Sequence, residues 1–296
     1  MSDASANLRS PAVAGRFYQQ DPTTCAGEAR YLCAQRPDVA GLPQNLLGAV
    51  VPHAGWVCSG RIAAGTFNVL HQRSGARTFF MTGSVHTVTL RGPALDSADA
   101  WSTPLGPVTV DADLRAAIAA LPGFETLDAA HQGEHSLEVQ LPLMQVIYES
   151  AFRIVPCMIP PSADAVDWGA SLGRLLADWP EPVGVIASSD LTHYGPNYRF
   201  APQGVGEEGR RWAHEVNDRR ILDLIEQMDA PAVVPEAQTN RSACGGGAIA
   251  ATMTAVQQMG ATRGYLLEHS DSVSELARVG QRDPSNSVGY AGIVFG

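Results

Sequence analysis

The chain has 296 residues, of which 45% are hydrophobic and 17% are charged, and this composition is typical of a globular protein and excludes a disordered one. Its formal net charge of -10 makes a nucleic acid or an anionic membrane surface a poor partner. No apolar run approaches the roughly 18 residues of a membrane span, and the first eleven residues carry no secretory signal. We therefore expect a cytoplasmic protein whose ligand is a small molecule, a metal ion or a peptide.

The cysteines form no disulfide or zinc pattern. They are an odd and scattered set without a C-x-x-C pair: Cys25, Cys33, Cys58, Cys157 and Cys244. Most of them are expected to be small buried hydrophobic residues. The first helix is predicted from Thr23 or Thr24 to about Gln35, and it places its two cysteines on similar faces, towards the core.

A buried strand is predicted at Leu46–Val51, because its residues are apolar on both faces. Pro52 ends this strand and His53 follows it directly. Ser59 is the expected N-cap of the Ala-rich helix that comes next. His53 is therefore placed at the carboxyl end of a core strand, the edge where open α/β sheets bind ligands.

The same pattern recurs at a second strand. Thr78–Thr82 is predicted as a strand, and His86 lies in the loop beyond its end. The segment Ala100–Asp111 suggests a loop with a short edge strand. Asp111 is expected to cap the helix that follows.

His131, Glu134 and His135 spell H-x-x-E-H, the inverted zinc-peptidase pattern. That site needs one regular helix to carry all three side chains, and Gly133 argues against such a helix. A zinc peptidase is therefore not expected. Glu134 and His135 remain candidates for the lining of a substrate pocket, since a helix kinked near Pro142 is predicted to begin at Ser136.

A third strand delivers polar residues to the same edge. Arg153–Pro160 and Val183–Ala187 are predicted as strands, with a helix reaching Trp179 between them. The second of these strands is followed by Ser188, Ser189, Asp190 and His193. One turn of helix would place Asp190 and His193 on the same side, where a carboxylate can orient an imidazole as a general base.

The last third of the chain adds a candidate thiol. Gly206–Gln227 is expected to form a long amphipathic helix whose apolar stripe includes Val216. Cys244 lies just before, or in the first turn of, a helix of small residues, and the helix dipole there lowers the pKa of a thiol. Gly245 and the two glycines after it allow a ligand to approach the backbone closely. Strands at Gly264–Glu268 and Val288–Phe295 complete the pattern.

Strands that alternate with helices, without repeats or a linker, predict one domain over residues 1–296. The expected fold is a three-layer α/β/α sandwich with a mostly parallel central sheet. Its strand ends bring together the residues that we expect to carry chemistry, which are His53, His86, Asp190, His193 and Cys244. Imidazole and thiolate are good ligands for iron, copper or zinc. Ser189 and Gly245 complete the predicted pocket.

Six stretches of the chain resemble the Memo family, called in bacteria and archaea the B protein of the AmmeMemoRadiSam system. They are RSPAVAGRFY, VPHAGWVCSG, TPLGPVTVD, EHSLEVQLP, SSDLTHYG and ACGGG, in this order. The family is similar in fold to the class III extradiol dioxygenases (LigB-like). The resemblance implies a non-haem iron or copper site held by His53, His86 and Cys244, with Asp190 and His193 beside it as catalytic residues. It also suggests radical-SAM and AMMECR-type proteins as pathway partners.

Two features of the chain depart from these patterns. Cys244 takes the place of a carboxylate ligand of the extradiol enzymes, which argues against ring cleavage. Gly83, Ser84 and Val85 precede His86, where the family more often has Gly-Pro and a polar residue.

Three hypotheses of function follow from these residues. The first is a redox metalloenzyme that uses iron or copper on a small substrate. The second is an adaptor that binds a peptide or protein without catalysis. The third is a zinc-dependent hydrolase, whose activity would survive the exclusion of oxygen.

Overall fold

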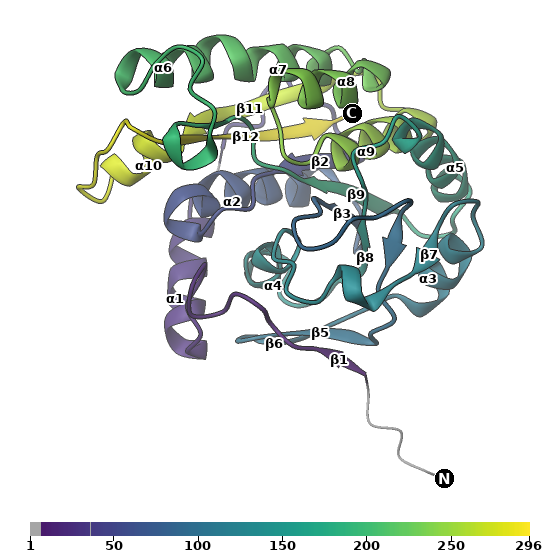
Figure 1. The fold of residues 1–296 in the computed structure, drawn as a ribbon. Helices are drawn as coiled ribbons and strands as arrows, with labels where there is room; N and C mark the ends of the chain where they lie inside the picture. The colour runs from purple at the N-terminus through teal and green to yellow at the C-terminus, as the bar shows by residue number, and fades with distance from the viewer. Residues whose placement is uncertain (1–6, 36) are drawn as a thin grey trace.

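A central sheet of nine strands organises the computed structural model, which describes residues 7–35 and 37–296 (Figure 1). The order of the strands across the sheet is β10 (His193–Tyr194), β12 (Ser287–Phe295), β2 (Gly48–Val51), β9 (Val183–Ser188), β3 (Thr78–Gly83), β8 (Arg153–Met158), β4 (Ala94–Leu95) and β7 (Glu125–Thr126). The remaining strand, β11 (Gly264–Asp271), pairs with β12. The first six residues, on which the expected lack of a secretory signal partly rests, lie outside the described residues.

The four central strands are parallel and end at one level. Ser188 of β9 pairs with Val51 of β2 on one side and with Gly83 of β3 on the other. The outer strands β10 and β12 pair antiparallel with their neighbours, and β4 pairs antiparallel with β8 but parallel with β7. The parallel part of the sheet therefore presents three adjacent carboxyl ends, from which the candidate site residues follow.

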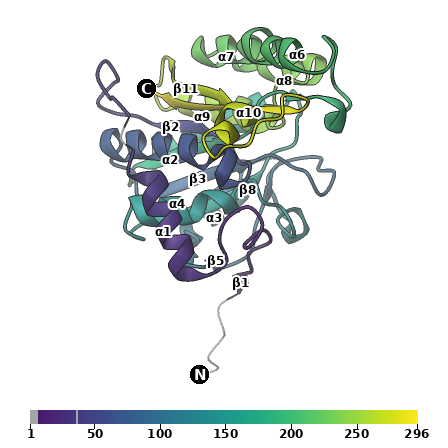
Figure 2. The same cartoon turned by 90° about the vertical axis from the view of Figure 1, so that its left-hand side faces the viewer.

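Helices cover both faces of the sheet, so the architecture is the three-layer α/β/α sandwich that the sequence predicts. One face packs against α1 (Pro22–Cys33), α2 (Trp56–Arg73) and α4 (Leu141–Ile147). The other face packs against α5 (Ala165–Ala177), α7 (Asp218–Glu226), α8 (Ala230–Asn240) and α9 (Gly246–Gln258). In Figure 2, α1 and α4 lie on the opposite side of the sheet from α6 (Glu207–Trp212), α7 and α8.

Smaller elements complete the fold. A separate sheet consists of β1 (Leu8–Arg9), β5 (Ala100–Thr103) and β6 (Gly106–Thr109), and the remaining α-helices are α3 (Ala112–Ala119) and α10 (Ser272–Ala277). The Asp111 carboxylate caps α3, as predicted, by accepting a hydrogen bond from Leu114 N at 3.0 Å. None of the helices in residues 7–35 and 37–296 is long and apolar enough to cross a membrane.

Two helices begin earlier than the sequence predicts, because other groups satisfy their first N–H groups. Helix α2 begins at Trp56, whose N–H donates to Phe17 O at 2.8 Å. Ser59 is therefore inside this helix rather than its N-cap, and its hydroxyl donates to Ala54 O at 3.0 Å. The cap of α1 is Asp21, whose carboxylate accepts from Thr24 N at 2.9 Å.

Three other expectations about helices need correction. Residues 190–193 do not form a helical turn, because His193 instead pairs with Val288 as part of β10. The region from Gly206 to Gln227 is α6 and α7 joined by a π-helical segment, Ala213–Asn217 (η4). The π turn shifts the helical register, and Val216 is 42% exposed instead of buried. Finally, the helix expected from Ser136 with a kink near Pro142 is α4, which begins only at Leu141 after a 3-10 turn (Glu138–Gln140) and accommodates Pro142 in its first turn. Helix α8 was not predicted.

Candidate metal centre

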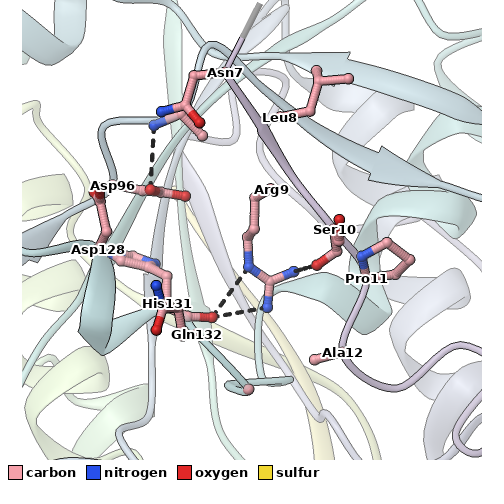
Figure 3. A pocket seen from close by; sticks show the side chains of 12 residues that line it. Asn7, Leu8, Arg9, Ser10, Pro11, Ala12, Asp96, Asp128, His131 and Gln132 are labelled. Atoms are coloured by element: carbon pink, nitrogen blue, oxygen red, sulfur yellow. Dashed lines mark hydrogen bonds between the residues drawn. The ribbon is translucent and has the colours of Figure 1, made fainter.

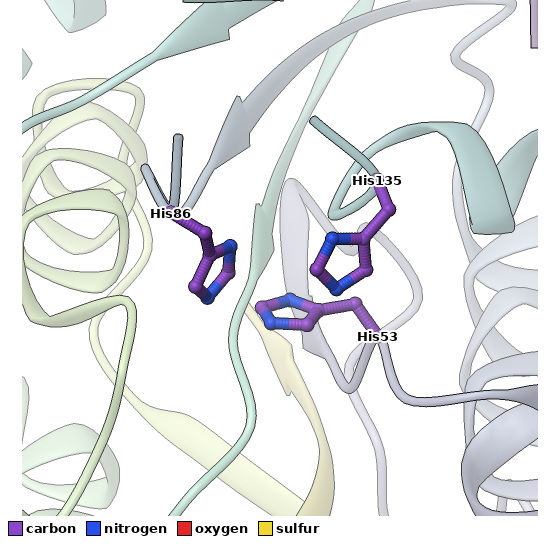
Figure 4. Close-up of side chains that lie close together, drawn as sticks. All are labelled: His53, His86 and His135. Atoms are coloured by element: carbon purple, nitrogen blue, oxygen red, sulfur yellow. The ribbon is translucent and has the colours of Figure 1, made fainter. Parts of the chain in front are cut away.

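Three imidazole rings meet at the carboxyl edge of the parallel strands. His53 follows β2, His86 follows β3, and His135 comes from the segment before α4. Figure 4 shows the three rings turned towards one another, and one ring nitrogen of each lies within 4.8 Å of the other two. The predicted meeting of His53 and His86 is therefore confirmed, and the structure adds His135 to them.

Hydrogen bonds fix the proton of the His53 ring. The Ser188 hydroxyl donates to Ser136 O at 2.6 Å, so its oxygen has to accept from His53 Nδ1 at 3.0 Å. The side-chain amide of Gln140 donates to the same oxygen at 3.3 Å. Because Nδ1 carries this proton, His53 Nε2 is the nitrogen left to face the cluster, as in metal-binding histidines oriented by a second hydrogen bond.

Glu134 holds His86 in the same way. Its carboxylate is fully buried and accepts from His86 N at 2.8 Å and from His86 Nδ1 at 3.1 Å. It also accepts from the backbone N–H groups of His135 and Ser136, at 2.8 and 2.9 Å. Burial raises the pKa of the Glu134 carboxyl, but the hydrogen bonds and charge of His86 outweigh burial and hold that pKa well below its usual range.

Within the cluster, the pKa of His86 is raised and the pKa of His135 is lowered. Burial lowers the pKa of His86, but hydrogen bonds to Cys244 and Glu134 outweigh burial and raise that pKa to about 10. Burial and the neighbouring His53 lower the pKa of His135 to about 4. His135 is therefore neutral at physiological pH, and its ring lies stacked at 5.0 Å from the ring of His86.

The thiol of Cys244 lies beside the three imidazoles. Cys244 stands immediately before Gly245, the N-cap of α9, and its Sγ lies 3.4 Å from His53 Nε2. Burial favours the neutral thiol, but the charge and hydrogen bonds of His53 and His86 hold the pKa of Cys244 well below its usual range. Two imidazole nitrogens and a sulfur of thiolate character thus share one small volume.

Small residues let the Cys244 backbone approach the strand ends. The Cys244 N–H donates to Asp190 O at 3.2 Å, and the Gly245 N–H donates to the Ser189 hydroxyl at 2.9 Å. A Cβ on Gly245 would lie 2.5 Å from Ser84 Oγ and 2.7 Å from Ser189 Cβ. Gly245 is therefore required for the position of Cys244 rather than only for ligand access.

Asp190 and His193 lie beside the imidazoles, as predicted, although not on a helix. The buried Asp190 carboxylate accepts from His53 N at 2.7 Å, and its Oδ2 lies 3.9 Å from His193 Nε2. Burial raises the pKa of Asp190, but His53 and His193 outweigh burial and lower it. Burial lowers the pKa of His193, but Asp190 and Cys244 outweigh burial and raise it. His193 Nε2 is buried and has no hydrogen-bond partner among the described residues, so charge rather than a hydrogen bond links it to the Asp190 carboxylate.

His131 points away from this group. Its Nε2 lies 3.0 Å from Ala94 O, and its ring packs on Trp101 at 5.7 Å. Residues 131–135 form turns rather than a helix, so the peptidase arrangement of H-x-x-E-H is not formed, as expected.

His131 and Gln132, in the loop that leads to Glu134, line a surface pocket of about 480 Å³ (Figure 3). Arg9 lines this pocket, and its guanidinium donates to His131 O at 3.0 Å and to the Glu138 carboxylate at 2.8 Å. Arg9 thus ties the N-terminal segment to the loop that carries Glu134.

Several supporting residues carried no signal in the sequence. Gln140 was not singled out, and Ser84 was noted only as a departure from the family pattern, because a glutamine or serine near a strand end is common and only the fold shows what it touches. Ser188 was recognised only as part of the strand end, whereas its hydroxyl sets the proton of His53.

Comparison with known proteins agrees on one family. A family model described as Memo-like protein matches residues 9–294. A "MEMO1 family protein" of Methanopyrus kandleri is 34% identical over 300 residues, covering 97% of this chain and 98% of the relative. Another of Methanosarcina barkeri is 35% identical over 290 residues, covering 97% and 99%.

A solved structure is similar in fold. The crystal structure of an uncharacterized protein from Escherichia coli K12 covers 85% of this chain and 100% of its own, with a TM-score of 0.50 and 12% identity. At this identity the similarity concerns the fold alone, and it agrees with the three-layer architecture described above.

Proposed function

The chain belongs to the Memo-like protein family, and from this premise we propose that it is a non-haem metalloprotein that binds iron, with copper as the alternative metal. His53, His86 and Cys244 would hold the ion, and His135 stands next to them. The observation that carries the proposal is the hydrogen bond between His53 Nε2 and Cys244 Sγ at 3.4 Å, with His53 Nδ1 tied to Ser188 on the far side of the ring. The substrate is a small molecule or a peptide, by expectation from the charge and composition.

The donor set fits a transition metal. Neutral imidazole and thiolate are borderline and soft ligands, which favour iron, copper or zinc over calcium or magnesium. The nitrogens are oriented by partners on their far side, Ser188 for His53 and Glu134 for His86, as metal ligands usually are. Bound there, iron or copper supplies one-electron redox chemistry and open coordination positions for oxygen or substrate.

The residues of the chain have distinct tasks in this proposal. His53, His86 and Cys244 give up their shared protons when an ion binds, because metal ligands have to be deprotonated. Asp190 keeps the backbone of His53 in place and stabilises the protonated form of His193, which then serves as the acid or base towards a substrate. Glu134 orients His86, and Ser189 orients the turn that carries Cys244.

The proposal is tested by metal analysis of protein purified without oxygen. We expect stoichiometric iron or copper in the wild type and its loss in His53→Ala and in Cys244→Ser. Cys58→Ser is the matched control, because Cys58 is also a partly exposed free thiol but lies outside the ligand group, and it should keep the metal. Iron and copper contents unchanged in both site variants would exclude this centre, and zinc in place of both would favour the hydrolase.

A further inference from the structure

A second group of metal-ligand side chains lies behind the loop that carries Asp190 and His193. It consists of His214 in η4, Asp218 at the start of α7 and His269 in β11, and one ligand atom of each lies within 4.8 Å of the others. The sequence carries part of this signal, since His214 and Asp218 are four positions apart on continuous helix and so share a face.

The Asp218 carboxylate is the centre of the group, and the surrounding residues leave a buried space that it fills. It is 1% exposed, and its Oδ2 lies 2.9 Å from His269 Nε2. A Cβ on Gly289 of the neighbouring strand would lie 2.2 Å from that same oxygen, so only glycine leaves room for the carboxylate. A buried carboxylate next to an imidazole is the arrangement from which a divalent cation can be held.

His214 gives the group access to solvent. It lies in the π turn, a helical irregularity that is frequent at functional sites. Its Nδ1 is buried without a hydrogen-bond partner within the described part of the chain. His214 also lines a surface pocket of about 300 Å³ together with Glu207, Arg210, Arg211 and Glu215.

We propose that His214, Asp218 and His269 bind a divalent transition-metal ion of the zinc type. Two imidazoles and one carboxylate are a usual zinc set, and three protein ligands leave a position for water on the pocket side. The rings of His214 and His269 now lie stacked at 3.9 Å with planes 12° apart, and nitrogen lone pairs lie in the ring planes. An ion can therefore bind only after the His214 ring has turned. This rotation breaks no hydrogen bond of His214 Nδ1, because that nitrogen has no partner in the described residues.

The charges around the group permit a cation. Arg210 and Arg211 share the pocket with His214, and the Arg210 guanidinium is paired with the Asp271 carboxylate at 2.8 Å and with Glu207 at 2.6 Å. Its charge is thus offset by two carboxylates. The Asp218 carboxylate, in contrast, forms no ion pair with an arginine in the described residues, and it is therefore available to a cation.

An ion at this position would support the neighbouring loop. The second oxygen of Asp218 accepts from Thr192 N at 3.0 Å, and Asn217 Nδ2 donates to Thr192 Oγ1 at 3.0 Å. Thr192 lies between Asp190 and His193, so a cation that fixes the carboxylate also fixes the backbone of the acid–base pair. The role assigned to Asp218 is to bind the ion and position Thr192, not to touch substrate.

The test uses cobalt(II), whose absorption reports its ligands, on full-length protein in which His53→Ala and Cys244→Ser disable the first centre. We expect about one equivalent of cobalt to bind, and both Asp218→Asn and His214→Gln to weaken that binding at least about tenfold. His71→Gln is the matched control and should bind as its parent does. Circular dichroism confirms that each variant is folded.

Two results would overturn the proposal. One is the absence of cobalt binding by the folded protein that lacks the first centre. The other is binding that neither Asp218→Asn nor His214→Gln weakens. If the variants fail to fold, wild-type crystals soaked in zinc decide the question: an anomalous peak between His214 and His269 supports the site, and no peak there refutes it. Neither result depends on whether the first centre holds iron.

Discussion

Glu134→Gln tests whether a buried carboxylate sets the orientation of His86. The substitution keeps the size of the side chain but replaces one oxygen with an NH₂ group. The carboxylate accepts four hydrogen bonds, two from His86 and one each from the N–H groups of His135 and Ser136. If the glutamine oxygen keeps the two backbone bonds on Oε1, its NH₂ group faces the backbone N–H of His86, and two donors meet.

The magnitude follows from the lost bond and the unpaired groups. A hydrogen bond to a charged acceptor contributes about 1.5–3 kcal/mol, and a buried donor left without a partner costs about 1–3 kcal/mol. We expect the free energy of unfolding to fall by about 2.5–6 kcal/mol, the sum of these two effects. We expect metal affinity to fall about 10–100-fold, because His86 loses the partner that orients it.

Glu138→Gln is the matched control for this variant. Glu138 is also a fully buried carboxylate, and it accepts from the Arg9 guanidinium, from the N–H groups of Ala12 and Val13 and from the Tyr18 hydroxyl. No hydrogen bond or ion pair joins Glu138 to His86 in the described residues. Urea unfolding should show a similar loss of stability for both variants, whereas metal titration should show a large loss only for Glu134→Gln. Equal metal affinity of Glu134→Gln and wild type would refute the assigned role of Glu134.

Three further predictions follow from the same group of residues. In metal-free protein at pH 7, iodoacetamide should alkylate Cys244 well before Cys58, since the pKa of Cys244 is lowered and burial raises that of Cys58, and mass spectrometry of the peptides checks the order. Gly245→Ala should lower the free energy of unfolding by about 1–3 kcal/mol in urea, because its Cβ meets Ser189; no loss would contradict the close approach. The depressed pKa of Glu134 stabilises the fold fully above its unfolded value of 4.5, and this contribution decreases progressively as the pH falls from 4.5 towards the depressed folded-state pKa. The stability difference between wild type and Glu134→Gln should therefore be smaller at pH 4 than at pH 6; a constant difference would count against it.

The sequence predicts the parallel core well, because burial on both faces leaves a simple signal. Leu46–Val51, Thr78–Thr82 and Val183–Ala187 are continuous apolar runs, and each one contains most of a strand of the structure. Because parallel strands end together, the sequence also brings His53 and His86 to one place. The sequence predicts helix boundaries less well. The start of α2, for example, depends on Phe17 O, which accepts from the first N–H of the helix although it is distant in the chain.

The rest of the site depends on contacts between distant segments. Asp190 and His193 were expected on a helical turn, but pairing of β10 with β12 extends this segment, and the two side chains still meet. The helix α8 was missed because Pro231 and Pro235 hide its pattern. His135 was expected to line a pocket, and its place among the imidazoles follows from Glu134, whose carboxylate fixes the backbone on both sides of it.

The central claim is that two imidazoles and one sulfur hold a single ion. A crystal grown without oxygen, with diffraction measured on both sides of the iron and copper absorption edges, tests it most directly. We expect one anomalous peak within bonding distance of His53 Nε2, His86 Nε2 and Cys244 Sγ. A peak that lies away from the sulfur, or no peak at these three atoms in protein that carries iron or copper, would contradict it.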